Sequence, residues 1–155
     1  MRMLGMSLAT ALLAAACGGT AATSSPSPTQ TTPPSPTPAP TIVAKVATDA
    51  KLGKIMVDSA TGKTLYLWAK DTDENSQCYD QCATFWPPLL TQAKVVAADG
   101  VTTGKFGVST RKDGAQQVTF NSRPLYFFAR DVAPGDTNGQ GSTGFGAVWT
   151  VVQIP

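Results

Sequence analysis

After residue 41, hydrophobic side chains occur in short runs rich in Val, Phe, Tyr and Trp, separated by Gly, Asp and Asn. There is little sustained helical periodicity, and such runs are typical of β-strands joined by turns. The pattern predicts strands at 42–47, 54–58, 63–69, 105–111, 115–121, 124–129 and 147–153. Turn-forming residues stand at 58–62, 112–114 and 121–122. We therefore predict a mainly β domain over residues 42–155.

One seven-residue segment recurs 60 residues along the chain. Residues 65–71 read LYLWAKD, and residues 125–131 read LYFFARD. Each copy follows a tight turn, precedes a polar loop, and is followed later by a Trp-containing apolar run. Such a duplication predicts a single antiparallel β domain made of two pseudo-symmetric repeats, about 50–90 and 105–153, related by a pseudo-twofold axis.

Both faces of the repeated strand are apolar. On a strand, Tyr66 and Trp68 share one face, while Leu65 and Leu67 share the other. The second copy places Tyr126 with Phe128 on one face and Leu125 with Phe127 on the other. Strands of this kind are covered on both sides, so most of these aromatic side chains should belong to the core. A groove for a sugar, a lipid or an apolar cofactor is the alternative.

These residues resemble the bacterial secreted-repeat lipoproteins of unknown function, which carry a duplicated Tyr-x-(Phe/Trp/Tyr)-x-x-Asp motif. The motif residues of this chain are Tyr66, Trp68, Asp71, Tyr126, Phe128 and Asp131. The resemblance extends through residues 78–89, 111–114 and 134–141, and it covers nearly all of 46–153. It implies an exported repeat protein without an established activity, and it assigns no catalytic or binding residue.

The N-terminus has the pattern of an export signal. One cation, Arg2, precedes an apolar run from Leu4 to Ala16 that is too short to span a bilayer. The sequence Leu-Ala-Ala-Ala-Cys at 13–17 resembles the lipobox of bacterial lipoproteins, which implies cleavage before Cys17 and diacylglycerol on its thiol. Acyl chains would anchor the protein to membrane lipid on the extracytoplasmic face. A secretory signal cleaved after Ala16 is the alternative.

The next segment cannot fold by itself. Thr20–Thr41 contains 7 Pro, 7 Thr, 4 Ser, 3 Ala and 1 Gln, with no charge and no large apolar side chain. Proline at this density favours polyproline II, which can hold a domain up to roughly 70 Å from a membrane at ~3.1 Å per residue. We predict a signal peptide at 1–16 and a lipidated, disordered Pro/Ser/Thr-rich stalk at 17–41.

The composition excludes several classes of function. The chain has no histidine, so Ser/His and Cys/His catalysis, His-ligated zinc and proximal-His haem are ruled out. A formal charge of +2 is too small to favour nucleic acid as a partner. We expect no catalytic residue, no metal and no cofactor.

Cys78 and Cys82 form an even pair in an oxidising compartment once Cys17 is lipidated, so a disulfide is the simplest prediction. Both sulfurs on one helical turn would strain the bridge. A redox role, or a soft metal such as copper, is the alternative.

The polar loops offer two further alternatives. Oxygen ligands alternate in the first loop at Asp71, Asp73 and Asn75, and in the second at Asp136, Asn138 and Gln140, as in a calcium loop. Neither loop continues to the bidentate Glu that such a site requires. Asp71 and Asp131 could instead cap the loops, pair with a cation, or form an acid/base dyad of a hydrolase.

Together these patterns predict a lipoprotein whose β domain is a non-enzymatic binding or structural module. Its partner would be an unknown envelope protein or a small ligand. An envelope redox or metal-handling protein using Cys78 and Cys82, and an Asp-dependent hydrolase, are the alternatives.

Overall fold

The computed structural model describes residues 39, 41–97 and 100–155. The signal peptide, Cys17 and nearly all of the stalk lie outside these residues and stay predictions. Within the described part, no helix is long and apolar enough to cross a membrane.

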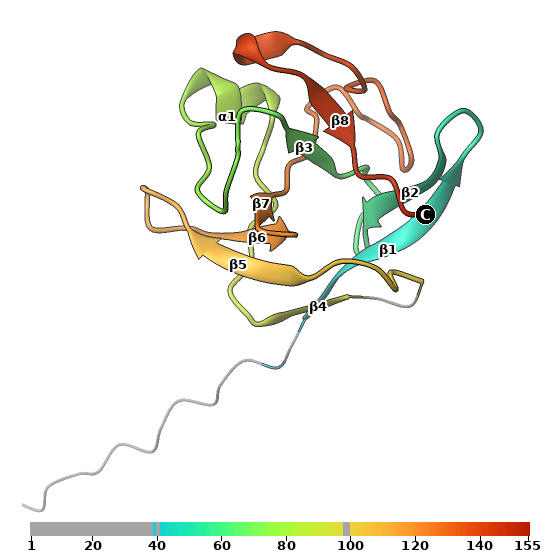
Figure 1. The fold of residues 1–155 in the computed structure, drawn as a ribbon, viewed down its shortest axis with the longest axis horizontal. Coiled ribbons are helices and arrows are strands. Elements are labelled where there is room, and N and C mark those ends of the chain that lie inside the picture. Colours follow the sequence, from blue (N-terminus) through green and yellow to red (C-terminus); the bar gives the residue numbers. More distant parts are fainter. Residues whose placement is uncertain (1–38, 40, 98–99) are drawn as a thin grey trace, which may run out of the picture. The chain divides into compact units, whose positions relative to one another are not determined.

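The described chain consists mainly of short strands (Figure 1). The elements are β1 (Thr41–Asp49), β2 (Gly53–Asp58), β3 (Tyr66–Trp68), α1 (Gln81–Phe85), β4 (Val95–Ala97), β5 (Phe106–Thr110), β6 (Gln116–Phe120), β7 (Arg123–Pro124), the 3-10 turn η1 (Gly144–Gly146) and β8 (Trp149–Val151). The predicted mainly β fold is confirmed. Strand β4 and the short helix α1 were not predicted.

The strands form three small sheets, ordered β2-β1-β4, β3-β8 and β5-β6-β7. Their pairs are antiparallel as predicted, except that β1 and β4 run parallel. A parallel pair needs a long crossover connection. Here the first repeat from β2 to α1 supplies that connection, so the exception follows from the chain order.

The predicted turns are confirmed by their backbone angles. Gly62 and Gly114 have φ of 74° and 83°, and Asn121 and Ser122 have φ of 50° and 57°. These positive values allow the tight reversals between neighbouring strands.

The two motif strands are shorter than predicted. The second, expected at 124–129, is reduced to β7 at 123–124, followed by isolated bridges at Tyr126. The reason is that successive residues bond to different segments. The N–H of Leu125 donates to Val118 O at 3.0 Å, and the N–H of Phe127 donates to Pro87 O at 2.8 Å. Between them, the N–H of Tyr126 donates to Tyr66 O at 3.1 Å, and the N–H of Tyr66 donates back to Tyr126 O at 2.8 Å. No continuous ladder can form.

Each half supplies a segment that bonds to the motif of the other half. In the first motif, β3 pairs with β8 of the second half, and Val152 N–H donates to Leu65 O at 3.0 Å. In the second motif, the equivalent bond runs from Leu89 N–H of the first half to Leu125 O at 2.9 Å. Tyr66 and Tyr126 exchange two backbone hydrogen bonds at the centre. This arrangement supports the predicted pseudo-twofold relation, and each half completes the other.

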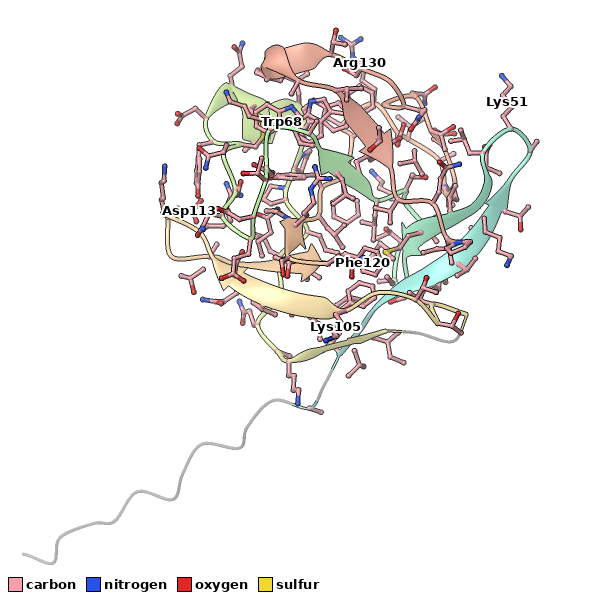
Figure 2. All side chains as sticks on the ribbon, viewed as in Figure 1. Lys51, Trp68, Lys105, Asp113, Phe120 and Arg130 are labelled. Carbon is pink, nitrogen blue, oxygen red and sulfur yellow. A yellow bond between two sulfur atoms is a disulfide. The ribbon has the colours of Figure 1, made fainter. Side chains whose placement is uncertain are left out.

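Two hydrophobic clusters fill the domain, and they follow the predicted strand faces. Leu65 and Leu125 belong to one cluster, with Leu67 and Phe127 packed against it. Tyr66, Trp68 and Tyr126 belong to the other, with Phe128 packed against it. Figure 2 shows Trp68 inside the domain and the charged side chains of Lys51 and Arg130 on its outside. The prediction that both faces are covered is confirmed.

The pairing of each motif with a segment of the other half predicts that neither half is stable alone. We expect fragments 41–101 and 102–155 to be unfolded separately, because each would expose the unpaired edge of its motif strand. Mixed together, they should regain the near-UV circular dichroism of the tryptophans, with the intact 41–155 chain as the reference. A native-like signal from either fragment alone would contradict this pairing as a stabilising feature.

Candidate functional site

The duplicated motif forms two reciprocal hydrogen bonds between the halves. Tyr66 Oη donates to Asp131 Oδ2 at 2.6 Å, and Tyr126 Oη donates to Asp71 Oδ2 at 2.6 Å. All four side chains are buried. We call these two contacts the Tyr–Asp pairs. The sequence singled out all four residues but did not predict that each tyrosine would bind the aspartate of the other repeat.

The second oxygen of each carboxylate holds the loop that follows it. Asp71 Oδ1 accepts the N–H of Gln77 at 2.8 Å, and Asp131 Oδ1 accepts the N–H of Asn138 at 3.0 Å. This geometry fits the loop-capping interpretation, and each aspartate bonds a tyrosine and its own loop rather than the other aspartate. Burial raises the pKa of both carboxyl groups, although the phenol and backbone donors oppose this effect. Burial also raises the pKa of both phenols.

One Tyr–Asp pair continues into a larger buried polar network. Tyr126 Oη lies 2.7 Å from Ser76 Oγ. Arg111, also buried, donates to Ser76 Oγ at 3.0 Å, to Gln117 Oε1 at 2.6 Å and to Cys78 O at 2.9 Å. In the other Tyr–Asp pair, the tyrosine hydroxyl has a backbone partner: Tyr66 Oη accepts the N–H of Gly139 at 3.3 Å. No pattern in the sequence indicated that an arginine would be buried here.

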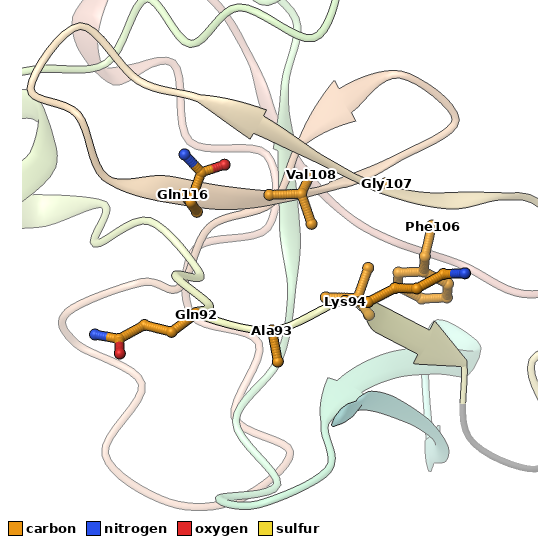
Figure 3. Close-up of a pocket in the computed structure, with 8 residues that line it drawn as sticks. Gln92, Ala93, Lys94, Phe106, Gly107, Val108 and Gln116 are labelled. Atoms are coloured by element: carbon orange, nitrogen blue, oxygen red, sulfur yellow. The ribbon is translucent and has the colours of Figure 1, made fainter. Parts of the chain in front are cut away.

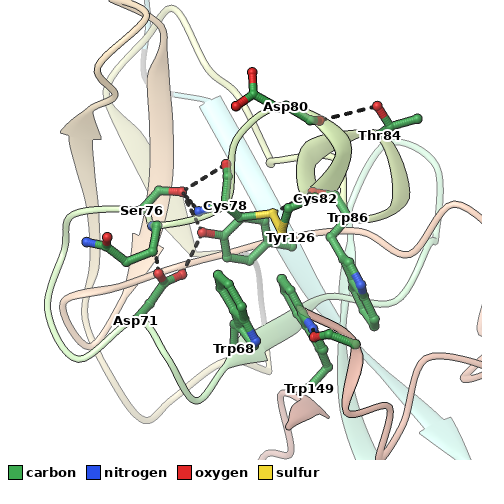
Figure 4. The surroundings of a disulfide bond; sticks show 12 residues. Trp68, Asp71, Ser76, Cys78, Asp80, Cys82, Thr84, Trp86, Tyr126 and Trp149 are labelled. Atoms are coloured by element: carbon green, nitrogen blue, oxygen red, sulfur yellow. Dashed lines mark hydrogen bonds between the residues drawn. A yellow bond between two sulfur atoms is a disulfide. The ribbon is translucent and has the colours of Figure 1, made fainter. Parts of the chain in front are cut away.

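The disulfide between Cys78 and Cys82 is present, with a Cα–Cα distance of 5.2 Å (Figure 4). Both cysteines are buried. The expectation that a bridge here would join two residues of one helical turn is wrong, because α1 begins only at Gln81 and the chain turns at Asp80 with a φ of 51°. In this bonded form the sulfurs are not thiolates, which are the form that soft metals bind.

The oxygen-rich loops bind their own backbone. Asp73 Oδ1 accepts the N–H of Asn75 at 2.7 Å, and Asp136 Oδ2 accepts the N–H groups of Val132 and Ala133 at 3.0 and 2.8 Å. Among the described residues, no group of three or more His, Cys, Asp or Glu side chains is placed to hold a metal. The calcium interpretation therefore has no supporting cluster in the described part of the chain.

The three tryptophans form one continuous stack. Trp149 lies between Trp68, at 4.8 Å between ring centroids and 5° between planes, and Trp86, at 3.9 Å and 2°. Phe128 continues the series at 4.4 Å from Trp86. Figure 4 shows the three indoles side by side next to the disulfide. We call Trp68, Trp149, Trp86 and Phe128 the aromatic stack, and its tryptophans are buried in the core as predicted.

One end of the aromatic stack opens at the surface in a small cavity. This cavity of about 210 Å³, which we call the aromatic pocket, is lined by Phe85, Trp86, Phe128, Arg130, Ser142, Gly144 and Phe145. Phe85 and Phe145 are each 37% exposed, and their ring centroids lie 6.0 Å apart. A second and larger groove of about 460 Å³ lies between β4 and β5, and Gln92, Lys94 and Gln116 are among the residues that line it (Figure 3).

Phe145 has a strained backbone. Its φ of 63° and ψ of 21° lie in the left-handed region, which is unfavourable for a bulky residue. The indole N–H of Trp149 donates to Gly144 O at 2.9 Å and ties this turn to the aromatic stack. Sequence reasoning missed Phe145 and gave Arg130 no role. The one available signal was an aromatic residue between two glycines, at 144–146.

The Tyr–Asp pairs predict a pH-dependent effect of Tyr126→Phe. In this variant the buried carboxylate of Asp71 loses the phenol hydrogen bond that offsets the cost of burying its charge. The pKa of Asp71 in the folded state therefore rises further above its unfolded value. A raised carboxyl pKa stabilises the fold at low pH, and this stabilisation is lost as pH rises through the folded pKa. We expect urea denaturation to show a loss of about 1–3 kcal/mol at pH 7 and a smaller loss near pH 4.

The matched control is Tyr79→Phe, since the Tyr79 hydroxyl only accepts a backbone N–H from Lys112 at 3.0 Å in a partly exposed position. A loss in Tyr126→Phe that is equal at both pH values would show that the carboxylate is not responsible.

The comparison with protein families agrees with the internal symmetry. The family model described as a secreted repeat of unknown function matches residues 46–90 and 107–153, which together make up more than half of the chain. These two matches coincide with the repeats predicted from the sequence. No curated protein and no solved structure matches the chain. The chain therefore belongs to the secreted repeats of unknown function, which places it in the extracellular space or the cell envelope.

Proposed function

We propose that this protein is a lipid-anchored envelope protein whose β domain is a non-enzymatic binding module, with the aromatic pocket as its binding site. The observation that carries this proposal is Phe145, an exposed aromatic side chain held in a strained backbone conformation opposite Phe85. Strained residues that the surrounding structure holds in place are found preferentially at functional sites. A turn without function could take a relaxed conformation.

The chemistry of the pocket indicates its ligand. The lining includes the aromatic rings of Trp86 and Phe128, whose planes are tilted by 32°, and the exposed cation Arg130. Rings and guanidinium together favour a planar apolar group that carries a negative charge. The cavity of about 210 Å³ is smaller than the ~300–1,000 Å³ typical of drug-sized ligands, so it would take one aromatic ring or a similar group.

The pocket supports binding rather than catalysis. The residues that line it include no carboxylate and no thiol, and its one hydroxyl belongs to Ser142. Asp71 and Asp131 are buried, are not among the residues that line the pocket, and are occupied by phenol and backbone donors. An acid/base mechanism would need a titratable group within reach of the ligand.

The lipid anchor rests on the sequence around Cys17. Small residues precede this cysteine directly after an apolar run of signal-peptide length, and the Pro/Thr-rich segment that follows suits a spacer between the membrane and the domain. Two or more acyl chains on Cys17 would provide stable membrane attachment.

The pocket predicts saturable binding of an aromatic anion. We expect 8-anilinonaphthalene-1-sulfonate to bind at one site and to be detected by energy transfer from the tryptophans, since Trp86 lines the pocket. Phe145→Ala and Arg130→Gln should each weaken binding about tenfold, or ~1.4 kcal/mol. The control is Val108→Ala, an exposed apolar residue of β5 outside the pocket. Equal affinity in all four proteins would exclude the pocket as the site.

The anchor predicts a modified amino terminus. Mass spectrometry of the mature protein should find a chain that begins at Cys17 with diacylglycerol on its sulfur. Cys17→Ser should release the protein from the membrane fraction, because the acyl chains are its proposed attachment. An unmodified amino terminus, or membrane association that survives Cys17→Ser, would contradict the anchor.

A further inference from the structure

The buried phenols of Tyr66 and Tyr126 have no part in the proposed binding function. Each lies fully buried with its hydroxyl 2.6 Å from a carboxylate oxygen. The third tyrosine of the chain, Tyr79, is partly exposed, and its hydroxyl accepts a backbone N–H. Two phenols of the chain thus contact a proton acceptor. Among the described residues Tyr79 lacks a carboxylate partner, and it serves as the reference.

A phenol that loses an electron becomes a strong acid, so oxidation of tyrosine is easiest when a base can take the proton at once. A hydrogen-bonded carboxylate is such a base, and the 2.6 Å distance allows direct transfer. Burial, which raises the pKa of Asp71 and Asp131, makes both carboxylates better proton acceptors.

The aromatic stack connects both phenols to the surface. Tyr66 meets the edge of Trp86 at 5.3 Å between centroids, and Tyr126 meets Trp149 at 5.1 Å. Trp86 and Trp149 stack at 3.9 Å, and Trp86 lines the aromatic pocket. Electron exchange weakens steeply with distance, so rings in contact exchange electrons faster than rings separated by aliphatic side chains. The path from the pocket reaches Tyr66 through Trp86, and Tyr126 through Trp86 and Trp149.

We propose that the aromatic stack carries single electrons from the two Tyr–Asp pairs to a one-electron oxidant that meets the surface at the aromatic pocket. The oxidant, a high-potential metal complex or a radical, takes one electron from Trp86. One electron from a tyrosine reduces the indole radical cation, and the phenolic proton of that tyrosine moves to its partner aspartate. The net change is one reduced oxidant, one neutral tyrosyl radical and one protonated carboxyl group. This activity does not depend on the binding of an aromatic anion.

The test uses flash-generated ruthenium(III) tris-bipyridine as the oxidant and the full mature chain in detergent. Transient absorption and electron paramagnetic resonance follow the indole and phenoxyl radicals. We expect a tyrosyl radical in the unmodified protein and in Tyr79→Phe. In the double variant Tyr66→Phe/Tyr126→Phe the indole radical should persist and the tyrosyl signal should be lost. A tyrosyl signal that disappears in Tyr79→Phe would overturn the proposal.

The path has its own test. In a Tyr66→Phe background, where Tyr126 is the remaining paired phenol, Trp149→Phe should slow phenoxyl formation about tenfold, or ~1.4 kcal/mol in the barrier. In a Tyr126→Phe background the same substitution should have no effect, because Tyr66 contacts Trp86 directly. Equal effects in both backgrounds would overturn the assigned path.

The unmodified protein provides a measurement that no folding defect can affect. Because the proton acceptor is an internal carboxylate rather than hydroxide or water, phenoxyl formation should be slower in D₂O and should not rise with pH between about 7 and 9. A rate that rises with pH, as expected for proton loss to solvent, would overturn the role of the aspartates.

Discussion

The reciprocal Tyr–Asp hydrogen bonds are the constraint on which the domain depends. Each half contains a buried carboxylate whose phenol donor belongs to the other half. A buried carboxylate without its donor would cost about 1–3 kcal/mol or more, so neither half is satisfied alone. The same carboxylates hold the loops that lead to the disulfide and to the turn at Phe145. One interaction therefore joins the halves and positions the surface features.

The symmetric interior contrasts with asymmetric loops. Tyr66 meets Trp86 as Tyr126 meets Trp149, and the edge-on distances of 5.3 and 5.1 Å are nearly equal. Outside this centre the halves differ. The first loop is closed by the Cys78–Cys82 disulfide and braced by Arg111, whereas the second packs Gly139 against Trp86, where an added Cβ would lie 2.7 Å from the ring. The aromatic pocket borders this second loop. The duplicated core is therefore shared by both repeats, whereas only the second of these two loops lines the aromatic pocket.

Sequence periodicity predicted what depends on local alternation and turn chemistry. It predicted the positions of β1, β2, β5 and β6, the two apolar faces of residues 65–68 and 125–128, and the reversals at Gly62 and Asn121. It could not predict that Tyr66 binds Asp131 rather than its own Asp71, because that choice depends on how the halves meet in space. Strand β4 is only three residues long and bonds in parallel to a distant strand, so no local pattern marks it. The turn at Phe145 is held by a tertiary hydrogen bond from Trp149 to Gly144 O, and a sequence pattern does not contain such a contact.

The position of Trp86 connects the aromatic pocket with the interior. Trp86 is buried, yet it lines the aromatic pocket, stacks on Trp149 and meets Tyr66 edge to face, so it contacts the pocket and the core at once. Packing from both repeats holds the ring of Trp86 in place, so a ligand need not order this side chain on binding. The shape of the pocket is therefore set by the pairing of the halves more than by its own loops. Any substitution that separates the halves should disturb the pocket as well, even if it lies at a Tyr–Asp pair that no ligand touches.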